Sequence, residues 1–276
     1  SLDYARERPQ GRLPSSKDPM AAPVSIIEHA DIKRMLLAQK AYSEGAYALC
    51  LLGTQLADDI HTAETPEERE YAHTLLDFLT PMIKTWPSEY GPKANYFAIQ
   101  VMGGHGYINE HPVEMFYRDN RLNPIHEGTT GIQSLDLLAR KVPMNNMAGY
   151  RAILVEMEKT IAVAQQQPEL AVYAGELEQA IVTLKSTTEV LLGAMAEKNI
   201  DLALSNSVKY LELFGNVIIA WLWLKQGIVA NAALANNPHQ ADTFFYRGKL
   251  QALKYFYRFE LPEINSWAKI LSDLDS

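Results

Sequence analysis

The sequence predicts an all-α fold made of two consecutive up-and-down helical bundles. Apolar residues recur at three- and four-residue spacing through most of the 276 residues, which is the helical period. No two strand-like segments are joined by a hairpin turn signal. The segment PMNNMAG at 143–149 resembles a linker. We therefore expect one bundle over residues 1–145 and an additional helical domain over residues 150–276.

The first half begins with signals for a helical hairpin. Residues 1–8 are expected to end a helix, and the proline-rich residues 9–25 to form a loop. A long helix then begins near Ala30. The next helix begins at TPEE (65–68), where a threonine N-cap, a proline at the first helical position and a glutamate at the third form a capping box. Apolar side chains over residues 71–86 fall on one face of this helix.

Glycine and proline delimit the remaining helices. A third helix, from about 92 to 102, is expected to end at Gly103-Gly104, and a short one to start at Pro112. Another follows Gly128, with inward residues Ile132, Leu135, Leu138 and Val142. Four longer patterns follow, the last ending before Pro262: residues 150–166, 169–198, 200–235 and 239–260.

Composition excludes several classes of function. The net charge of −8, with acids and bases mixed along the chain, argues against a nucleic-acid-binding protein. The single cysteine, Cys50, excludes an intrachain disulfide, and its apolar surroundings predict a buried side chain. The apolar window Val217–Leu224 is far shorter than the roughly 20 residues of a membrane span, so we expect a core helix. A cytoplasmic location fits, and the start of the chain resembles a helix cut from a longer protein.

The stretch QVMGGHGY at residues 100–107 interrupts the helical pattern. Its glycines resemble a dinucleotide-binding fingerprint, but the third glycine and a preceding strand are missing, so we reject a Rossmann site. The residue pattern leaves two interpretations open. The glycines either turn a corner between helices or let the backbone approach a ligand closely.

Metal and hydrolase chemistry have little support in the sequence. A di-iron bundle needs two Glu-x-x-His motifs, and only one occurs, from Glu70 to His73. His105, His111 and His126 lack the i, i+4 spacing of a helical metal pair. No Gly-x-Ser-x-Gly motif is present.

Glu127 has two possible roles. Acidic residues favour the first turn of a helix, which is a purely structural explanation. In an apolar cleft, however, desolvation would raise the pKa of the carboxyl group and make it a usable general base. The preceding segment YRDNR at 117–121 is explained by ion pairs, with a phosphate-binding arginine as a second possibility.

Three elements in this region together resemble the C-terminal domain of acyl-CoA dehydrogenases. They are QVMGGHGY at 100–107, YRDNR at 117–121 and IHEGT at 125–129, in the order and near the spacing of that family. The opening LDYARER at 2–8 also looks like the helix that starts this domain. The resemblance implies an FAD-dependent enzyme that removes an α-proton and a β-hydride from an acyl-CoA thioester.

The resemblance also assigns roles to single residues. Glu127 matches the glutamate that removes the α-proton. Gln100 and Gly104 match positions that contact the ADP part of FAD, usually that of a neighbouring subunit. Thr129 matches a threonine near the flavin, and Arg8 an arginine near the FAD pyrophosphate. The family's Arg-x-x-Phe-Gly is not reproduced after Arg8.

Further departures concern two neighbouring residues and the length of the chain. His126 replaces a common tyrosine, and Gly131 replaces a common glutamine. The family's N-terminal helical and middle β domains have no counterpart here, so we expect a C-terminal fragment that is inactive alone. Residues beyond 150 resemble the extra domain of the large bacterial subfamily that includes 3-methylmercaptopropionyl-CoA dehydrogenase, through YLELFG at 210–215 and FYRGKL at 245–250.

The implied partners are an acyl-CoA substrate, an acceptor such as an electron-transfer flavoprotein, and further copies of the same chain. Two alternatives remain from the sequence. One is a helical binding or assembly module without catalysis, and the other is a metal-dependent helical oxidase.

Overall fold

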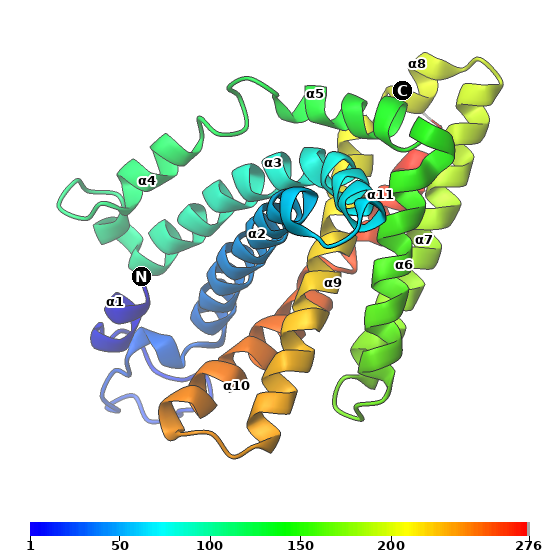
Figure 1. Ribbon diagram of the computed structural model, residues 1–276. Helices are drawn as coiled ribbons and strands as arrows, with labels where there is room; N and C mark the ends of the chain where they lie inside the picture. The colour runs from blue at the N-terminus through cyan, green and yellow to red at the C-terminus, as the bar shows by residue number, and fades with distance from the viewer. Residues whose placement is uncertain (275–276) are drawn as a thin grey trace.

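The computed structural model describes residues 1–274, and the chain is helical over most of that length (Figure 1). The predicted all-α fold is confirmed, since the only strand-like pairing among the described residues is an isolated bridge between Pro9 and Ser25. The longer helices are α2 (Ala30–Thr62), α3 (Pro66–Met102), α6 (Met144–Gln165), α7 (Ala171–Ala196), α9 (Ser207–Ala235) and α10 (Gln240–Tyr255). The shorter ones are α1 (Leu2–Glu7), α4 (Val113–Asn120), α5 (Thr130–Leu135), α8 (Ile200–Leu204) and α11 (Glu263–Ser272).

Helices α2 and α3 form an antiparallel hairpin (Figure 1). The predicted capping box at its turn is confirmed. The Thr65 hydroxyl accepts the backbone N–H of Glu68 at 3.2 Å, and the Glu68 carboxylate accepts the backbone N–H of Thr65 at 3.1 Å. Two free backbone N–H groups at the start of α3 are therefore hydrogen-bonded by side chains of the turn itself.

Helix α3 is one continuous helix, so the prediction of a separate helix over 92–102 is wrong. Pro81, Pro87 and Pro92 lie inside it. Each proline removes one backbone hydrogen bond, which normally ends or kinks a helix. Here Pro81 and Pro92 are buried, and large side chains of α3 pack against α2 and α9 along its length. Tertiary packing therefore outweighs the local signal.

The inward face predicted for the helix after Gly128 is only half right. Leu138 and Val142 are buried, but Ile132 and Leu135 are exposed. After α5 the chain forms a π-helical turn, η3 (Asp136–Lys141), in which the Val142 N–H bonds to the Leu137 carbonyl five residues back at 2.9 Å. The extra residue per turn rotates the apolar face, which a constant helical period cannot anticipate.

The expected linker at 143–149 is packed against the first bundle. Asn145, Asn146 and Met147 have positive φ values of 48°, 56° and 63°, which kink the chain at the start of α6. Gly149 is buried, and a Cβ there would lie 2.8 Å from Cβ of Phe78. One main core contains residues from both halves, and the division into domains at 145–150 stays a prediction.

Helix α9 runs through the middle of the molecule and touches helices of both halves (Figure 1). By length and composition it could cross a membrane, and it alone has this property among the described residues. All residues of Val217–Leu224 are buried within the protein, as expected of a core helix. It is separated from the short α8, so the pattern predicted over 200–235 forms two helices.

Two further expectations are wrong. The sequence predicts that the last helix ends before Pro262, whereas Pro262 stands at the N-cap position of a further helix, α11. The π-helical turn η4 (Phe256–Glu260) connects α10 to it. Cys50 is exposed. Its neighbour Leu49 occupies the buried face of α2, and a helix turns adjacent residues about 100° apart.

Candidate functional site

The glycine-rich corner closes α3 and leads towards α4 through the 3₁₀ turn η2 (Gly103–Gly106). Gly103 has a φ of +58° and donates its N–H to the Gln100 carbonyl. A Cβ on Gly103 or Gly104 would meet no atom within 4 Å, so the backbone borders open space. A Cβ on Gly106 would lie 2.7 Å from the Ile99 carbonyl oxygen. The missing side chain of Gly106 therefore lets the corner pack against α3. The backbone of Gly103 and Gly104 faces open space, where a ligand could approach it closely.

Three of the predicted cofactor contacts are associated with this corner. Gln100 is exposed on the last turn of α3, next to the open backbone of Gly104. The Tyr4 hydroxyl lies 3.1 Å from Nδ1 of His105, which places α1 against the corner. Arg8 is exposed at the end of α1, one turn after Tyr4. The end of α3 thus carries Gln100 and Gly104, with the helix that precedes Arg8 beside them.

Glu127 lies in the loop between α4 and α5, and its side chain is exposed. Gly128 has a φ of +76°, a backbone conformation that favours glycine. Thr129 is the N-cap of α5, and its carbonyl accepts the Gln133 N–H at 2.9 Å. The conformation of the two residues after Glu127 is therefore set by the local backbone.

The structure separates Glu127 and Thr129 from the corner. Their loop is tied to α3 at Glu89, whose carboxylate accepts the Thr130 hydroxyl at 2.5 Å. Glu89 and Gln100 are eleven residues apart on one helix, a distance of about 16 Å at 1.5 Å per residue. The predicted site residues thus form two groups along α3.

The electrostatic setting of Glu127 is simple. Within residues 1–274 no hydrogen bond or ion pair engages its carboxylate, so the group is available to a ligand. Arg118 pairs with Asp119 at 3.4 Å on the exposed side of α4, in line with the ion pairing expected for that segment. No cluster of three or more histidine, cysteine, aspartate or glutamate side chains in the described chain could hold a metal ion.

Apolar side chains are exposed throughout the region between the corner and η3. They come from α4, α5 and the loops before them, and they are Tyr107, Ile108, Met115, Phe116, Tyr117, Leu122, Ile125, Ile132 and Leu135. So many exposed apolar side chains in one segment are typical of a surface that another protein part covers. We call these nine residues the apolar segment.

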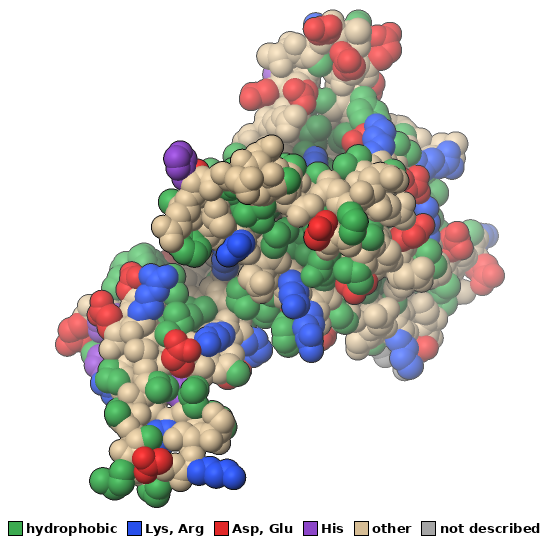
Figure 2. Space-filling view, turned by 90° about the horizontal axis from the view of Figure 1, so that it is seen from below, with side chains coloured by type: hydrophobic (Ala, Val, Ile, Leu, Met, Phe, Trp, Pro, Cys, Tyr) green, Lys and Arg blue, Asp and Glu red, His purple; other side chains and the backbone are tan. Residues whose placement is uncertain are grey.

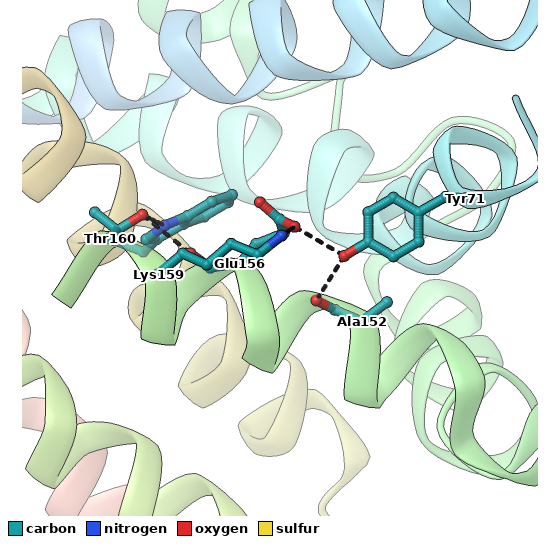
Figure 3. A network of polar contacts seen from close by, with 6 residues as sticks. Tyr71, Ala152, Glu156, Lys159 and Thr160 are labelled. Carbon is teal, nitrogen blue, oxygen red and sulfur yellow. Dashed lines mark hydrogen bonds and ion pairs between the residues drawn. The ribbon is translucent and has the colours of Figure 1, made fainter. Parts of the chain in front are cut away.

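A separate cavity of about 640 Å³ lies between the α2–α3 tip, α6 and α9. In Figure 3, Tyr71 points from α3 to α6, where its hydroxyl donates to Glu156 at 2.8 Å. Burial and the neighbouring Glu156 raise the pKa of Tyr71 to about 12.

Trp221 of α9, which also lines this cavity, donates to Thr160 of α6 at 2.7 Å. Acidic side chains gather at the tip above this cavity, at the top of Figure 2. The cavity contains none of the predicted catalytic or cofactor-binding residues.

Comparison with known proteins decides the family. Residues 2–142 match the family model described as acyl-CoA dehydrogenase, C-terminal domain. The chain belongs to the acyl-CoA dehydrogenase family. Residues 153–276 of this acyl-CoA dehydrogenase chain match a second model, described as acetyl-CoA dehydrogenase C-terminal like. The resemblance drawn from the three sequence elements is confirmed.

Curated acyl-CoA dehydrogenases align over nearly the whole chain. The 3-methylmercaptopropionyl-CoA dehydrogenase of Ruegeria pomeroyi is 34% identical, over 99% of this chain and 45% of that protein. A butyryl-CoA dehydrogenase of Syntrophomonas wolfei is 32% identical, over 96% of this chain and 43% of that protein. The broad-specificity linear acyl-CoA dehydrogenase FadE5 of Mycobacterium tuberculosis is 28% identical, over 100% and 46%. The chain spans less than half the length of these relatives.

A solved structure shows the same fold. The acyl-CoA dehydrogenase of Bacillus anthracis, determined in complex with FAD, superposes with a TM-score of 0.63 at 16% identity. The match covers 99% of this chain and 46% of that one. The chain thus has the fold of the matched part of that enzyme, while the roles of its single residues stay predictions.

Sequence inspection missed the residues that hold the Glu127 loop. Lys84 donates from α3 to the Asn123 carbonyl at 3.0 Å, and Glu89 accepts the Thr130 hydroxyl. These partners are 39 and 41 residues apart in the chain, so no local pattern connects them.

Proposed function

We propose that this chain is the C-terminal part of an FAD-dependent acyl-CoA dehydrogenase of the large bacterial subfamily, which oxidises the α,β bond of an acyl-CoA thioester. The observation that carries the proposal is Glu127. Its exposed carboxylate lies beside Gly128 and Thr129, in the family order after the open corner at Gly103-Gly104.

In this proposal Glu127 is the general base. A carboxylate that removes a proton next to a thioester carbonyl needs shielding from bulk water, because desolvation raises its pKa towards a useful value. Glu127 is exposed in the described chain, so the substrate and the remaining domains of the longer enzyme would provide that shielding. The positive φ of Gly128 lets the backbone turn directly after Glu127, which leaves the Glu127 carboxylate exposed.

The residues fit a bound FAD. Gln100 offers an exposed amide and Gly104 an open backbone, which suit the polar ADP part. Thr129 would lie near the flavin, and Arg8 would face the pyrophosphate. When bound, FAD supplies the capacity to accept the β-hydrogen as hydride. Gln100 lies about 16 Å along α3 from Glu89, which holds the loop of Thr129. This separation agrees with contacts to FAD molecules of two different subunits.

The proposal includes partners and a location. The apolar segment supports contact with further copies of the chain or with domains that the longer relatives have, because exposed apolar surface of this extent is costly in water. An electron-transfer flavoprotein would reoxidise the flavin, and the location would be cytoplasmic. We propose that the chain alone is inactive, since it spans under half of its relatives.

The test replaces the base in the longer protein that carries this chain. Glu127→Gln removes the basic carboxylate and keeps its size, so turnover of an acyl-CoA with an artificial dye acceptor should fall by about a hundredfold to ten-thousandfold. The flavin absorption spectrum should persist. Unchanged turnover would exclude Glu127 as the base.

Two further measurements complete the test. A flavin spectrum and acyl-CoA-dependent dye reduction by the isolated chain would contradict its proposed inactivity. A helical assembly module remains the second candidate, because the apolar segment suits a purely structural interface equally well. Absence of flavin and of turnover in the longer protein would favour that alternative.

A further inference from the structure

The loop that carries Glu127 is irregular and exposed, yet it is closed on itself. The Thr130 N–H donates to the Pro124 carbonyl at 3.3 Å, and the His126 N–H donates to the Leu122 carbonyl at 3.1 Å. Glu127 lies midway between the two ends joined by the first of these bonds. Such a loop can still move as a unit unless side chains tie it to a rigid element.

Lys84 ties the beginning of the loop to α3. Its ammonium group donates to the Asn123 carbonyl at 3.0 Å, and the side chain is partly buried. Asn123 also donates to Asn120 at 2.7 Å, and Asn120 donates to Asn95 of α3 at 2.8 Å. Hydrogen bonds from charged donors are about twice as strong as neutral ones, so Lys84 is the stronger of these anchors.

Glu89 ties the end of the loop to the same helix. Its carboxylate accepts the Thr130 hydroxyl at 2.5 Å, and its side chain is also partly buried. Lys84 and Glu89 are five residues apart, a rise of about 7.5 Å along α3. Within residues 1–274 no ion pair engages either group, so each charge is directed to the loop rather than to an opposite charge.

We propose that Lys84 and Glu89 are positioning residues that hold Glu127 at the site of proton removal. The proposal rests on the function proposed above for Glu127. In this role the two groups do not touch the substrate. They hold both ends of the Glu127 loop against α3, a helix packed into the main core. A displacement of about 1 Å at a reacting group can cost a hundredfold in rate.

The first experiment uses the longer protein and removes the Thr130 hydroxyl. Thr130→Val keeps the shape and loses the bond to Glu89, whereas Thr130→Ser keeps the bond. We expect amide hydrogen exchange over residues 121–130 to accelerate about tenfold or more in the valine variant, with residues 207–235 unchanged. We also expect kcat to fall about ten- to a hundredfold. KM should stay within about twofold, and the serine variant should regain most of kcat.

Matched variants separate positioning from general stability. Lys84→Met should accelerate exchange in the same loop and lower kcat, because it frees the Asn123 carbonyl. Thr80→Val is the control: among the described residues, the hydroxyl of this exposed threonine of α3 bonds only to the Leu76 carbonyl of its own helix, so neither exchange nor kcat should change. Equal acceleration at 121–130 and 207–235 would indicate general destabilisation and overturn the proposal. Unchanged loop exchange and kcat in both Thr130→Val and Lys84→Met would overturn it too.

Failure of the positioning proposal can be distinguished from failure of the proposed function. If Glu127→Gln retains turnover, Glu127 is not the base, and the positioning proposal falls with it even where the loop exchange responds. If Glu127→Gln abolishes turnover while the Thr130 and Lys84 variants leave exchange and kcat unchanged, the base assignment stands and only the positioning proposal fails.

Discussion

Asn216 of α9 joins three elements through one buried amide. Its Oδ1 accepts hydrogen bonds from Nε1 of Trp86 and from the Tyr90 hydroxyl, each at 3.0 Å. Its Nδ2 donates to the Glu260 carbonyl at 3.0 Å. Asn216 is fully buried, so these partners have no access to water in its place. The amide therefore satisfies groups from α3 and η4 at the same time.

Replacing this amide should be costly. In Asn216→Leu the Trp86 and Tyr90 donors lose their acceptor, and an orphaned buried polar group costs about 1–3 kcal/mol. We expect the free energy of unfolding to fall by roughly 3 kcal/mol in urea denaturation followed by tryptophan fluorescence. Asn265→Leu, at an exposed asparagine, is the control and should change stability by less than about 0.5 kcal/mol. Equal losses in both variants would contradict the central role of Asn216.

Single residues also show what the sequence could predict at this scale. Gly103, with its positive φ at the end of α3, follows directly from the Gly-Gly signal. The exposure of Cys50 does not, because an apolar run of five residues on a helix covers both its buried and exposed sides. The anchors Lys84 and Glu89 are undetectable without the fold, since their partners are distant in the chain.

At the scale of elements, the α2–α3 turn depends on its capping box. Thr65→Ala removes the acceptor for the Glu68 N–H and should lower the free energy of unfolding by about 1 kcal/mol. Thr54→Ala, at an exposed position inside α2, is the matched control. It should be neutral or slightly stabilising, because alanine favours the helix interior. Chemical denaturation of both variants checks this, and a smaller loss for Thr65→Ala than for Thr54→Ala would refute it.

The elements that were mispredicted share a cause. Pro87 lies inside α3 instead of separating two helices, and Pro262 begins a further helix after the predicted one over 239–260. The π-helical turns η3 and η4 shifted the apolar face by one residue. Proline signals and helical periodicity are local, whereas each of these outcomes depends on what packs against the element.

At the scale of the whole molecule, a partly buried charge cluster joins α2 to α10. Nζ of Lys249 lies 2.7 Å from the Glu44 carboxylate, which also pairs with Lys40. Burial raises the pKa of Glu44, but the hydrogen bonds and charges of Lys249 and Lys40 outweigh it, so the pKa lies below its ordinary value of 4.5. The ionised carboxylate therefore stabilises the contact between the two halves of the chain.

This pKa shift has a defined pH dependence. A carboxyl group whose pKa is lower in the folded state contributes its full stability above its ordinary pKa, and the contribution is lost as the pH falls through the folded value. We expect Glu44→Gln to be less stable than the natural protein at pH 7, with the difference shrinking below pH 4.5. Urea midpoints from pH 7 to pH 3 measure it.

An exposed ion pair provides the control for that series. Glu28→Gln breaks the pair with Lys33 at 3.2 Å, and it should have little effect at any pH because solvent screens exposed pairs. A Glu44→Gln difference that is constant across the pH range would show that the carboxylate's charge contributes nothing.

The sequence by itself determined the helical class, the capped α2–α3 turn, the glycine corner and the ordered elements that identify the family. These features depend on neighbouring residues: periodicity, capping and backbone conformation act over a few positions. Only the tertiary structure decided that α3 is continuous, that α9 fills a core shared by both halves, and that Lys84 and Glu89 hold the Glu127 loop. These features depend on contacts between residues far apart in the chain, which exist only once the helices have packed.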